Sequence, residues 1–295
     1  MTRKYAFFPG CMIPARFPQF EASALKVLKV LDIELEKISG WTCCPEPLSM
    51  QTLNKEMWYS VAARNISLAE SEGLDILTLC NGCNDTLFEA NKSLKADETL
   101  RRNVNRNLRE IGRSFEGKIA VKSVLRVLYE DIGVEEIKRH VKVPLRGAKV
   151  AVHYGCHMFP ELEEFDDIKH PHSLKDLVHA LGAEVVSYPS EMVCCAAFAR
   201  PINEDLSLEF VKKKLEDLAN ASAECLVVMC PYCFLQLDLG QVTISRKSSR
   251  NYNIPIVYYT QLLGLAMGFS PREMGLHYHM TKIDNFAERI ATANS

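Results

Sequence analysis

The sequence lacks several features that would assign it quickly to a common class of protein. It has no run of 18 or more apolar residues, so we expect no transmembrane helix. Its first residues include two basic side chains but no long apolar stretch, which argues against a secretory signal. A net charge of only −2 provides no general attraction to nucleic acid or to anionic membranes. We therefore expect a cytoplasmic protein with neither a membrane span nor a nucleic-acid partner.

No G-x-G-x-x-G segment is present either, so the chain has no sign of a flavin or nicotinamide site of the dinucleotide-binding type. If the chain carries out redox chemistry, it therefore requires other subunits to supply electrons from soluble carriers.

Cysteine is abundant, with 11 among 295 residues. A reducing cytoplasm disfavours a disulfide framework, which leaves a metal site, a metal–sulfur cluster or redox-active thiols. Cys225 lies inside an apolar run, where we expect a core thiol. The other ten cysteines form two sets in the same order. The first set is C-x31-CC-x35-C-x2-C, with Cys11, Cys43, Cys44, Cys80 and Cys83, and the second is C-x37-CC-x34-C-x2-C, with Cys156, Cys194, Cys195, Cys230 and Cys233.

The two sets are copies of one sequence unit. Corresponding cysteines are separated by 145 (156 − 11), 151 (194 − 43) and 150 (230 − 80) residues. A nearly constant period of about half the chain indicates an internal duplication. The flanking segments also correspond: YAFFPGCM matches VAVHYGCH, and DILTLCNGC matches CLVVMCPYC. We therefore predict two cysteine-rich modules, one over residues 1–143 with a helical insertion and one over residues 144–295.

Short apolar runs alternate with amphipathic stretches in both halves. We expect strands at 5–8, 33–38, 75–79, 150–153, 184–188 and 225–229, and helices at 20–31, 53–69, 174–181 and 204–222. Helices around 91–111 and 125–141 are expected to form an insertion and a connector. This alternation predicts an α/β fold made of two Rossmann-like modules with parallel sheets. Because the cysteines follow predicted strands, five thiols should meet at the carboxyl ends of the strands in each module.

Several groups could be bound by five thiols. Structural zinc and a cubane four-iron cluster each take four ligands, so either would leave one thiol unused. Neighbouring thiolates such as Cys43 and Cys44 are better suited to a polynuclear iron–sulfur cluster, because they can bind different irons. A thiol–disulfide relay through Cys80 and Cys83 is a third interpretation, although it gives the other three cysteines no role.

The pattern resembles the duplicated cysteine-rich CCG module found in the B-type subunit of heterodisulfide reductase. The segments GWTCCPEP, TLCNGC, VPLRGAKVAVHYGCH and CPYCFLQLDLGQ carry this resemblance, which extends over nearly the whole chain. Two positions depart from the motif, because Pro45 and Ala196 stand where the CCG glycine is usual.

The resemblance implies two noncubane 4Fe-4S clusters, one held by each set of five cysteines, with zinc in one or both modules as the alternative. It also implies a substrate, the mixed disulfide of coenzyme M and coenzyme B, bound between the two clusters. The implied electron donors are a ferredoxin-like iron–sulfur subunit and a flavin-containing subunit, with a hydrogenase or formate dehydrogenase as further partners.

Reduction of a disulfide takes two electrons, and two facing clusters could each supply one and capture one thiolate. His157 is a candidate proton donor, and His153 is a second, weaker candidate. Arg16 and Arg200, in loops after cysteine positions, are candidates for binding the anionic groups of the substrate. The alternatives are a related subunit of a sulfur-oxidising complex that acts on a protein-bound thiol or persulfide, and a zinc-bearing electron-transfer scaffold.

Overall fold

The computed structural model describes residues 2–248, 250–283 and 286, and it contains two four-stranded parallel sheets. The first sheet has the order β2-β1-β3-β4, and the second has the equivalent order β6-β5-β7-β8. The strands of the first sheet are β1 (Arg3–Phe8), β2 (Ile33–Glu36), β3 (Ile76–Thr78) and β4 (Val121–Ser123). Those of the second are β5 (Lys149–His153), β6 (Glu184–Val185), β7 (Cys225–Val228) and β8 (Ile256–Tyr258). The predicted fold class is therefore confirmed.

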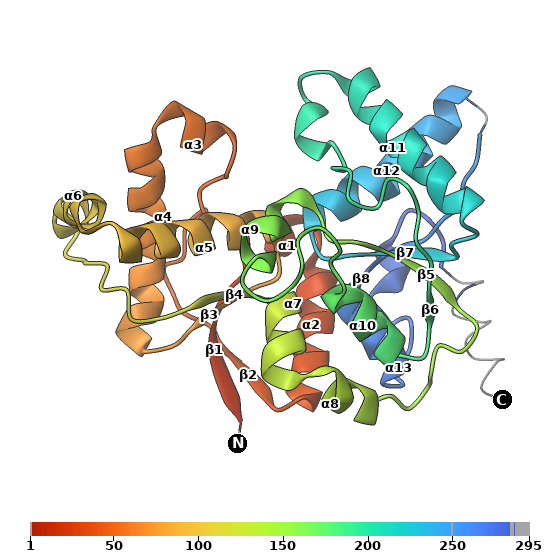
Figure 1. Ribbon diagram of the computed structural model, residues 1–295, viewed down its shortest axis with the longest axis horizontal. Coiled ribbons are helices and arrows are strands. Elements are labelled where there is room, and N and C mark those ends of the chain that lie inside the picture. Colours follow the sequence, from red (N-terminus) through yellow and green to blue (C-terminus); the bar gives the residue numbers. More distant parts are fainter. Residues whose placement is uncertain (1, 249, 284–285, 287–295) are drawn as a thin grey trace.

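Helices connect the strands in both modules, which lie side by side in Figure 1. The first module contains α1 (Met12–Arg16), α2 (Pro18–Val30), α3 (Ser49–Leu53), α4 (Lys55–Glu72), α5 (Asn81–Ala96) and α6 (Glu98–Arg109), followed by α7 (Val124–Arg126), the π-helical turn η1 (Val127–Ile132) and α8 (Val134–Arg139). The second contains η2 (Cys156–Met158), α9 (Phe159–Leu162), α10 (Ser173–Ala180), η3 (Ala197–Ala199), α11 (Glu204–Asn220), α12 (Pro231–Ser248), α13 (Tyr259–Ala266) and η4 (Leu276–Tyr278).

Equivalent local signals produce the same elements in both halves. The central strands β3 and β7 are completely buried, as expected for short apolar runs covered on both faces of a parallel sheet. The side chain of Asn54 caps α4 by accepting a hydrogen bond from the backbone of Met57, and Asn203 caps α11 in the same way through Leu206. The two caps are 149 residues apart, which gives the register of the duplication in this region.

Sequence analysis did not predict the fourth strand of either sheet, because β4 and β8 run directly into the helices α7 and α13, with no turn residues to mark the end of the strand. The segment 125–141, expected to be a connector, forms α7, η1 and α8, which follow β4 as α13 follows β8. Helix α8 packs on α10 of the second module, whereas α13 packs on α2 of the first. The two modules are thus interlocked by a reciprocal exchange of helices.

Aromatic and polar contacts reinforce this exchange. The Phe20 ring stacks on Tyr258 with centroids 4.5 Å apart, and the buried Ser23 and Thr260 hydroxyls are 2.7 Å apart. Glu161 of α9 is fully buried against the first module, where its carboxylate accepts hydrogen bonds from the Asn84 amide at 2.7 Å and the Ser123 backbone at 3.0 Å. Burial raises the pKa of Glu161 to about 7.

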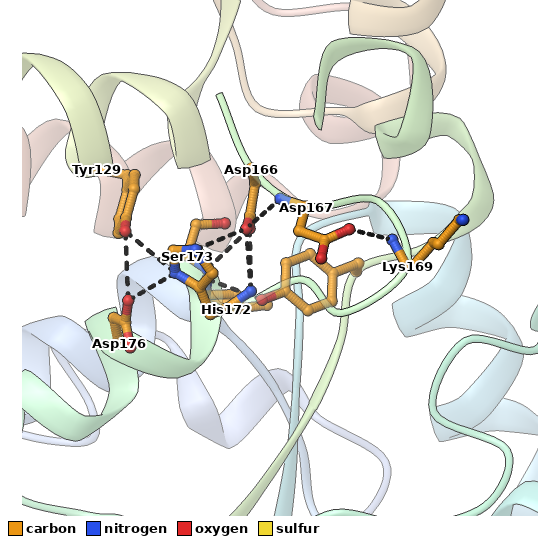
Figure 2. A network of polar contacts seen from close by, with 9 residues as sticks. Tyr129, Asp166, Asp167, Lys169, His172, Ser173 and Asp176 are labelled. Carbon is orange, nitrogen blue, oxygen red and sulfur yellow. Dashed lines mark hydrogen bonds and ion pairs between the residues drawn. The ribbon is translucent and has the colours of Figure 1, made fainter. Parts of the chain in front are cut away.

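The second module has a longer segment after its first cysteine, and a polar network organises it (Figure 2). The Asp166 side chain is fully buried and accepts hydrogen bonds from the backbone of Ser173 at 2.8 Å and of His172 at 3.1 Å. The His172 ring lies between Asp166 and Asp176, with nitrogen–oxygen distances of 3.2 and 2.9 Å. Tyr129 of η1 donates a hydrogen bond to Asp176 at 3.3 Å, so the network also ties this segment to the first module.

Candidate metal–sulfur cluster site

The cysteines lie at the carboxyl ends of the strands, as predicted. Cys11 and Cys80 follow β1 and β3, and Cys156 and Cys230 follow β5 and β7. In the observed strand order these pairs of neighbouring strands are the topological switch points, where open α/β sheets form their binding crevice. The adjacent cysteine pairs come from the long loops after β2 and β6.

Thiol-to-thiol interactions connect the cysteines within each module. In the first, Cys44 interacts with Cys43 and Cys83, and Cys83 interacts in turn with Cys80. Cys11 lies close enough to Cys43 for its charge to raise the pKa of that thiol.

The second module has the corresponding arrangement. Cys156 and Cys194 have their sulfurs 3.7 Å apart, and the line continues through Cys195 and Cys233 to Cys230. All eleven cysteines of the chain are without a disulfide.

The two sets meet at one point, where the Cys80 and Cys230 thiols interact across the module boundary. Both cysteines immediately precede a long helix, α5 or α12, and Cys83 and Cys233 lie in the first turns of these helices. The partial positive charge of a helix N-terminus stabilises thiolates and other anions. The structure therefore places two pairs of thiols, one from each module, at facing helix N-termini.

Neighbouring thiols share protons unequally within these sets. Hydrogen bonds from Cys43 and Cys83 lower the pKa of Cys44 to about 4, and hydrogen bonds from Cys156 and Cys195 lower that of Cys194 to about 2. The thiol hydrogen bond to Cys44 and burial raise the pKa of Cys43. Metal ions bind thiolates and displace these protons, so a crowded set of thiols is a favourable setting for a soft metal.

A glycine precedes the first cysteine of each set because a side chain has no room there. Gly10 has φ +67°, and a Cβ at this position would lie 2.8 Å from the Cys83 sulfur. Gly155 has φ +82°, and its Cβ would lie 3.3 Å from the Cys233 sulfur and 3.0 Å from the Asn81 amide nitrogen. The backbone thus approaches the last sulfur of each set closely.

Different side chains anchor the two loops that carry the adjacent cysteines. In the first module, the buried Asn65 amide donates a hydrogen bond to the Cys43 carbonyl at 2.9 Å and accepts one from the Thr42 backbone at 3.1 Å. In the second, the buried Lys214 ammonium donates a hydrogen bond to the Ser190 carbonyl. Sequence analysis missed both anchors, because each lies on a helix distant from the cysteines in sequence.

The missing glycine of the CCG motif has different consequences in the two loops. Ala196 adopts left-handed φ and ψ of 58° and 26°, so the glycine position does require this conformation in the second module. Pro45 is not among the residues with positive φ, and its ring fixes φ in the negative range. The first loop therefore turns in another way, and the Thr86 hydroxyl holds it by donating a hydrogen bond to the Pro45 carbonyl at 2.8 Å.

The first set of thiols is open and the second is covered. Cys11 and Cys43 are exposed, whereas Cys156 and Cys194 are partly buried. Phe198 and Tyr232 stack with centroids 5.1 Å apart and line a small cavity together with cysteines of the second set. By the cysteine register, their counterparts in the first module are the smaller residues Pro47 and Gly82.

The two predicted histidines lie beside the second set. His157 lines the same cavity, and its Nδ1 is 2.5 Å from Asp85 of the first module, while Nε2 is buried without a partner. Burial alone would lower the pKa of His157, but the hydrogen bond and charge of Asp85, together with the charges of Cys230 and Cys194, outweigh burial and raise the pKa.

His153 is fully buried, which lowers its pKa to about 3 and keeps it neutral. Its Nδ1 is 3.2 Å from the Glu191 carbonyl oxygen, and its Nε2 has no hydrogen-bond partner. One ring nitrogen lies within 4.8 Å of the Cys195 and Cys233 sulfurs. Sequence analysis did not identify Asp85 as a partner of His157. The only signal in the sequence is that Asp85 follows Cys83 by two residues, in the first turns of α5.

The predicted arginines are less closely associated with the thiols. Arg16 is exposed at the end of α1 and is not in a loop as expected. Arg200 directly follows η3 and donates hydrogen bonds to Glu204 at 3.0 Å and Thr243 at 3.4 Å. Neither residue forms a described contact with a cysteine.

The residues present are suited to metal–sulfur clusters. The five interacting sulfurs of each set exceed the four positions of a tetrahedral zinc site. Beside the second set lie the rings of His153 and His157, whose buried Nε2 atoms have no hydrogen-bond partner among the described residues. None of the described helices combines the length and apolar character needed to cross a bilayer.

Comparison with known proteins agrees with this description. The profile of the cysteine-rich domain CCG matches residues 5–88 and 150–238, once in each half of the chain. The B-type subunit of a ferredoxin/F420H2-dependent CoB-CoM heterodisulfide reductase from Methanosarcina acetivorans is 38% identical over 97% of both chains. The membrane anchor subunit of an 8-methylmenaquinol:fumarate reductase from Wolinella succinogenes is 34% identical over 95% of this chain and 98% of its own length.

A crystal structure of a hypothetical protein from Helicobacter pylori shares the fold, with a TM-score of 0.76 at 14% identity over 96% of this chain and 52% of that one. The match of both halves to the cysteine-rich domain supports metal–sulfur clusters in both modules. The chain therefore carries two CCG cysteine-rich domains and belongs to the family of B-type heterodisulfide reductase subunits, which are oxidoreductase components.

Proposed function

We propose that this chain is the disulfide-reducing subunit of a cytoplasmic heterodisulfide reductase complex, and that it reduces the coenzyme M–coenzyme B mixed disulfide to two thiols. The observation that carries this proposal is the meeting of the two thiol sets at Cys80 and Cys230. Cleavage of a disulfide consumes two electrons, so two one-electron centres on either side of one substrate match the reaction.

Each set of five cysteines would hold one noncubane 4Fe-4S cluster, which when bound supplies one electron and a metal ion for the product thiolate. The first cluster would use Cys11, Cys43, Cys44, Cys80 and Cys83, and the second Cys156, Cys194, Cys195, Cys230 and Cys233. The five-thiol count supports the noncubane type, since a cubane requires only four.

The surrounding residues bind and orient the substrate in this proposal. His157 would direct Nε2 to the leaving sulfur and donate its proton, while Asp85 fixes the ring through Nδ1. His153, which is buried and neutral, would orient the second set of thiols. Arg16 is free to turn toward an anionic substrate group, whereas Arg200 would first have to exchange its contact with Glu204.

Electrons would reach the chain from a ferredoxin-like iron–sulfur subunit that is itself reduced by a flavin subunit, with a hydrogenase or formate dehydrogenase upstream. The exposed thiols Cys11 and Cys43 support electron entry through the first module, because electron transfer requires a close approach.

The Wolinella relative supports one rival function, since a fumarate reductase subunit of nearly the same length is 34% identical. A subunit of this kind would exchange electrons with a quinol or with another subunit and would not cleave a disulfide. A sulfur-oxidising complex, in contrast, would act on a protein-bound thiol or persulfide.

An anaerobic assay separates these functions. The purified complex, supplied with a reduced viologen, should release one equivalent each of coenzyme M and coenzyme B per mixed disulfide. Cys195→Ser should abolish this activity, whereas Cys225→Ala should retain it, because Cys225 is a buried cysteine outside both sets. Wild-type complex that contains iron but does not cleave the disulfide, or full activity of Cys195→Ser, would refute the proposal.

A further inference from the structure

Lys214 is a buried cation that forms no ion pair within the described part of the chain. It lies on α11 and is 1% exposed, and its ammonium donates a hydrogen bond to the Ser190 carbonyl and lies 5.2 Å from the centre of the Tyr188 ring. Glu191 is close in sequence to Ser190, but its carboxylate pairs with Lys175 at 2.7 Å and not with Lys214. A buried charge without a counter-charge is costly, so the structure around Lys214 has to supply a negative partner.

The second set of thiols lies close to the contact between Lys214 and Ser190. Ser190 adjoins Glu191, whose carbonyl oxygen is 3.2 Å from His153 Nδ1, and a ring nitrogen of His153 lies within 4.8 Å of the Cys195 and Cys233 sulfurs. Burial lowers the pKa of Lys214 to about 8, and Cys233, Cys195 and Cys194, in that order, are the strongest of the charges that oppose this shift. An iron–sulfur cluster held by thiolates carries net negative charge and gains one more on reduction. Lys214 is therefore placed to interact with the reduced form more strongly than with the oxidised form.

The equivalent position in the first module carries no charge, although the partly exposed Arg64 guanidinium donates a hydrogen bond to the Asn65 amide oxygen at 3.2 Å. The two helix caps, Asn54 and Asn203, are 149 residues apart, and the same interval relates Lys214 to Asn65 (214 − 149). Asn65 is equally buried and anchors the equivalent loop, but its amide is neutral. The duplication has thus kept a loop anchor at this position and changed its charge.

A second position changes charge in the opposite sense. Glu46 follows Cys44 by two residues, and the cysteine register aligns it with Ala197 (197 − 151). Its carboxylate accepts hydrogen bonds from the backbone of Leu48 at 2.7 Å and of Ser49 at 2.6 Å, and its charge raises the pKa of Cys44. The first set of thiols therefore has an added anion and the second an added cation.

We infer that Lys214 and Glu46 set unequal reduction potentials, so that the cluster of the second module is the more easily reduced of the two. The charge of Lys214 favours an added electron in the second module, and the charge of Glu46 disfavours one in the first. Reduction potentials of iron–sulfur clusters respond to local charge and to hydrogen bonds on the sulfurs. An electron that enters at the open first module would consequently pass to the covered second module. This inference rests on the proposed pair of clusters but not on the identity of the substrate.

The test is an anaerobic redox titration of the purified complex, followed by electron paramagnetic resonance without any disulfide present. Cys156→Ser should perturb only the signal of the second module and so identifies it. Lys214→Met retains the length of the stem and removes the charge. We expect it to lower the potential of the second cluster by about 59 mV, a tenfold change in a one-electron equilibrium, with much less change in the first.

Lys213→Met is the matched control, because Lys213 is the neighbouring residue on the exposed face of the same helix and pairs with Asp217 at 2.7 Å. It should change neither potential. Glu46→Gln is an independent second variant and should raise only the potential of the first cluster. If Lys214→Met fails to retain iron, the result for Glu46→Gln decides the question.

The inference would be overturned if Lys214→Met shifted the reduction potentials of both clusters equally, or if neither variant shifted a potential. It would also be overturned if the first cluster of the wild-type protein were reduced before the second. Wild-type complex without iron would instead refute the proposed function, so the two failures are distinguishable.

Discussion

The two modules have one skeleton but different surroundings. Both modules place a glycine against the last cysteine of the set, two adjacent cysteines on a long loop, and a C-x2-C segment at a helix N-terminus. The first module leaves Cys11 and Cys43 exposed, whereas the second covers its thiols with Phe198 and Tyr232. The difference shows that duplication preserved the residues that gather the sulfurs, while the residues around them diverged toward separate tasks.

The largest effect is expected where the two modules agree. Gly10→Ala should abolish metal binding in the first module, because its Cβ would lie 2.8 Å from the Cys83 sulfur. Gly155→Ala should have a smaller effect on the second, where the closest atom, at 3.0 Å, is the end of the Asn81 side chain. Iron per chain measures both. Gly73→Ala is the control, since Gly73 also has positive φ but no atom within 4 Å of the added Cβ, and equal iron loss in all three variants would contradict this explanation.

The fifth residue after the first cysteine distinguishes the modules strongly. Arg16 is exposed at this position, whereas Glu161 is buried and bonds to Asn84 and Ser123 of the first module. Glu161→Leu should lower the free energy of unfolding by about 2–3 kcal/mol, because it leaves buried donors without acceptors. Urea unfolding under anaerobic conditions measures the loss. Glu161→Gln should cost clearly less, and an equal loss in both variants would exclude the hydrogen bonds as the cause.

The covered and open sites should release metal at different rates. Iron of the first module should pass to a chelator first, and Phe198→Ala should accelerate the slower release from the second by about tenfold, because it removes the ring stacked on Tyr232. Absorbance of the iron–chelator complex follows the reaction. Phe210→Ala is a matched control, since Phe210 is a partly exposed phenylalanine on α11 that is absent from the lining of the cavity. A single release rate for wild-type protein would show that exposure does not distinguish the sites.

Restoring glycine at the third position of the CCG motif should change the free energy of unfolding in opposite directions in the two modules. Ala196→Gly should increase the free energy of unfolding by up to about 1 kcal/mol, because it relieves a left-handed alanine at φ 58°. Pro45→Gly should decrease it by about 1 kcal/mol, because it increases the freedom of the unfolded chain without relieving strain. Urea unfolding compares the two. If both variants changed the free energy of unfolding in the same direction, the result would contradict the conclusion that the two loops turn differently.

The smallest expected effect concerns the network present only in the longer segment of the second module. The hydrogen bond to Asp176, together with the charges of Asp166 and Asp167, raises the pKa of His172, although burial opposes this. The resulting stabilisation is fully present below the unfolded pKa of about 6.5 and is lost as pH rises through the higher folded value.

Half of the His172 side chain is exposed, so solvent screening limits the gain to less than about 1 kcal/mol. Comparison of wild-type protein with His172→Gln at about pH 6 and about pH 8 tests this, with a difference expected only at the lower pH. A difference that is independent of pH would show that Tyr129 and the backbone bonds of Asp166 hold the segment without help from the charge on His172.

Sequence analysis identified the features that depend on local pattern. The duplication, six of the eight strands and the grouping of cysteines after strands all follow from periodicity and spacing. The missed strands β4 and β8 continue without a turn into α7 and α13, so no local signal separates strand from helix, and their pairing depends on β3 and β7. The exchange of α8 and α13 between modules, the Asp85–His157 pair and the anchors Asn65 and Lys214 are long-range contacts. Spacing within one chain does not encode which distant helix a side chain will reach.

The most direct test of the central proposal is metal and sulfide analysis of anaerobically purified wild-type, Cys44→Ser and Cys195→Ser proteins. Two iron–sulfur clusters in facing modules predict about eight irons and eight sulfides per wild-type chain, and about half of each in either variant. One zinc per module without sulfide, or simultaneous loss of all metal from both variants, would contradict a separate cluster in each set of five thiols.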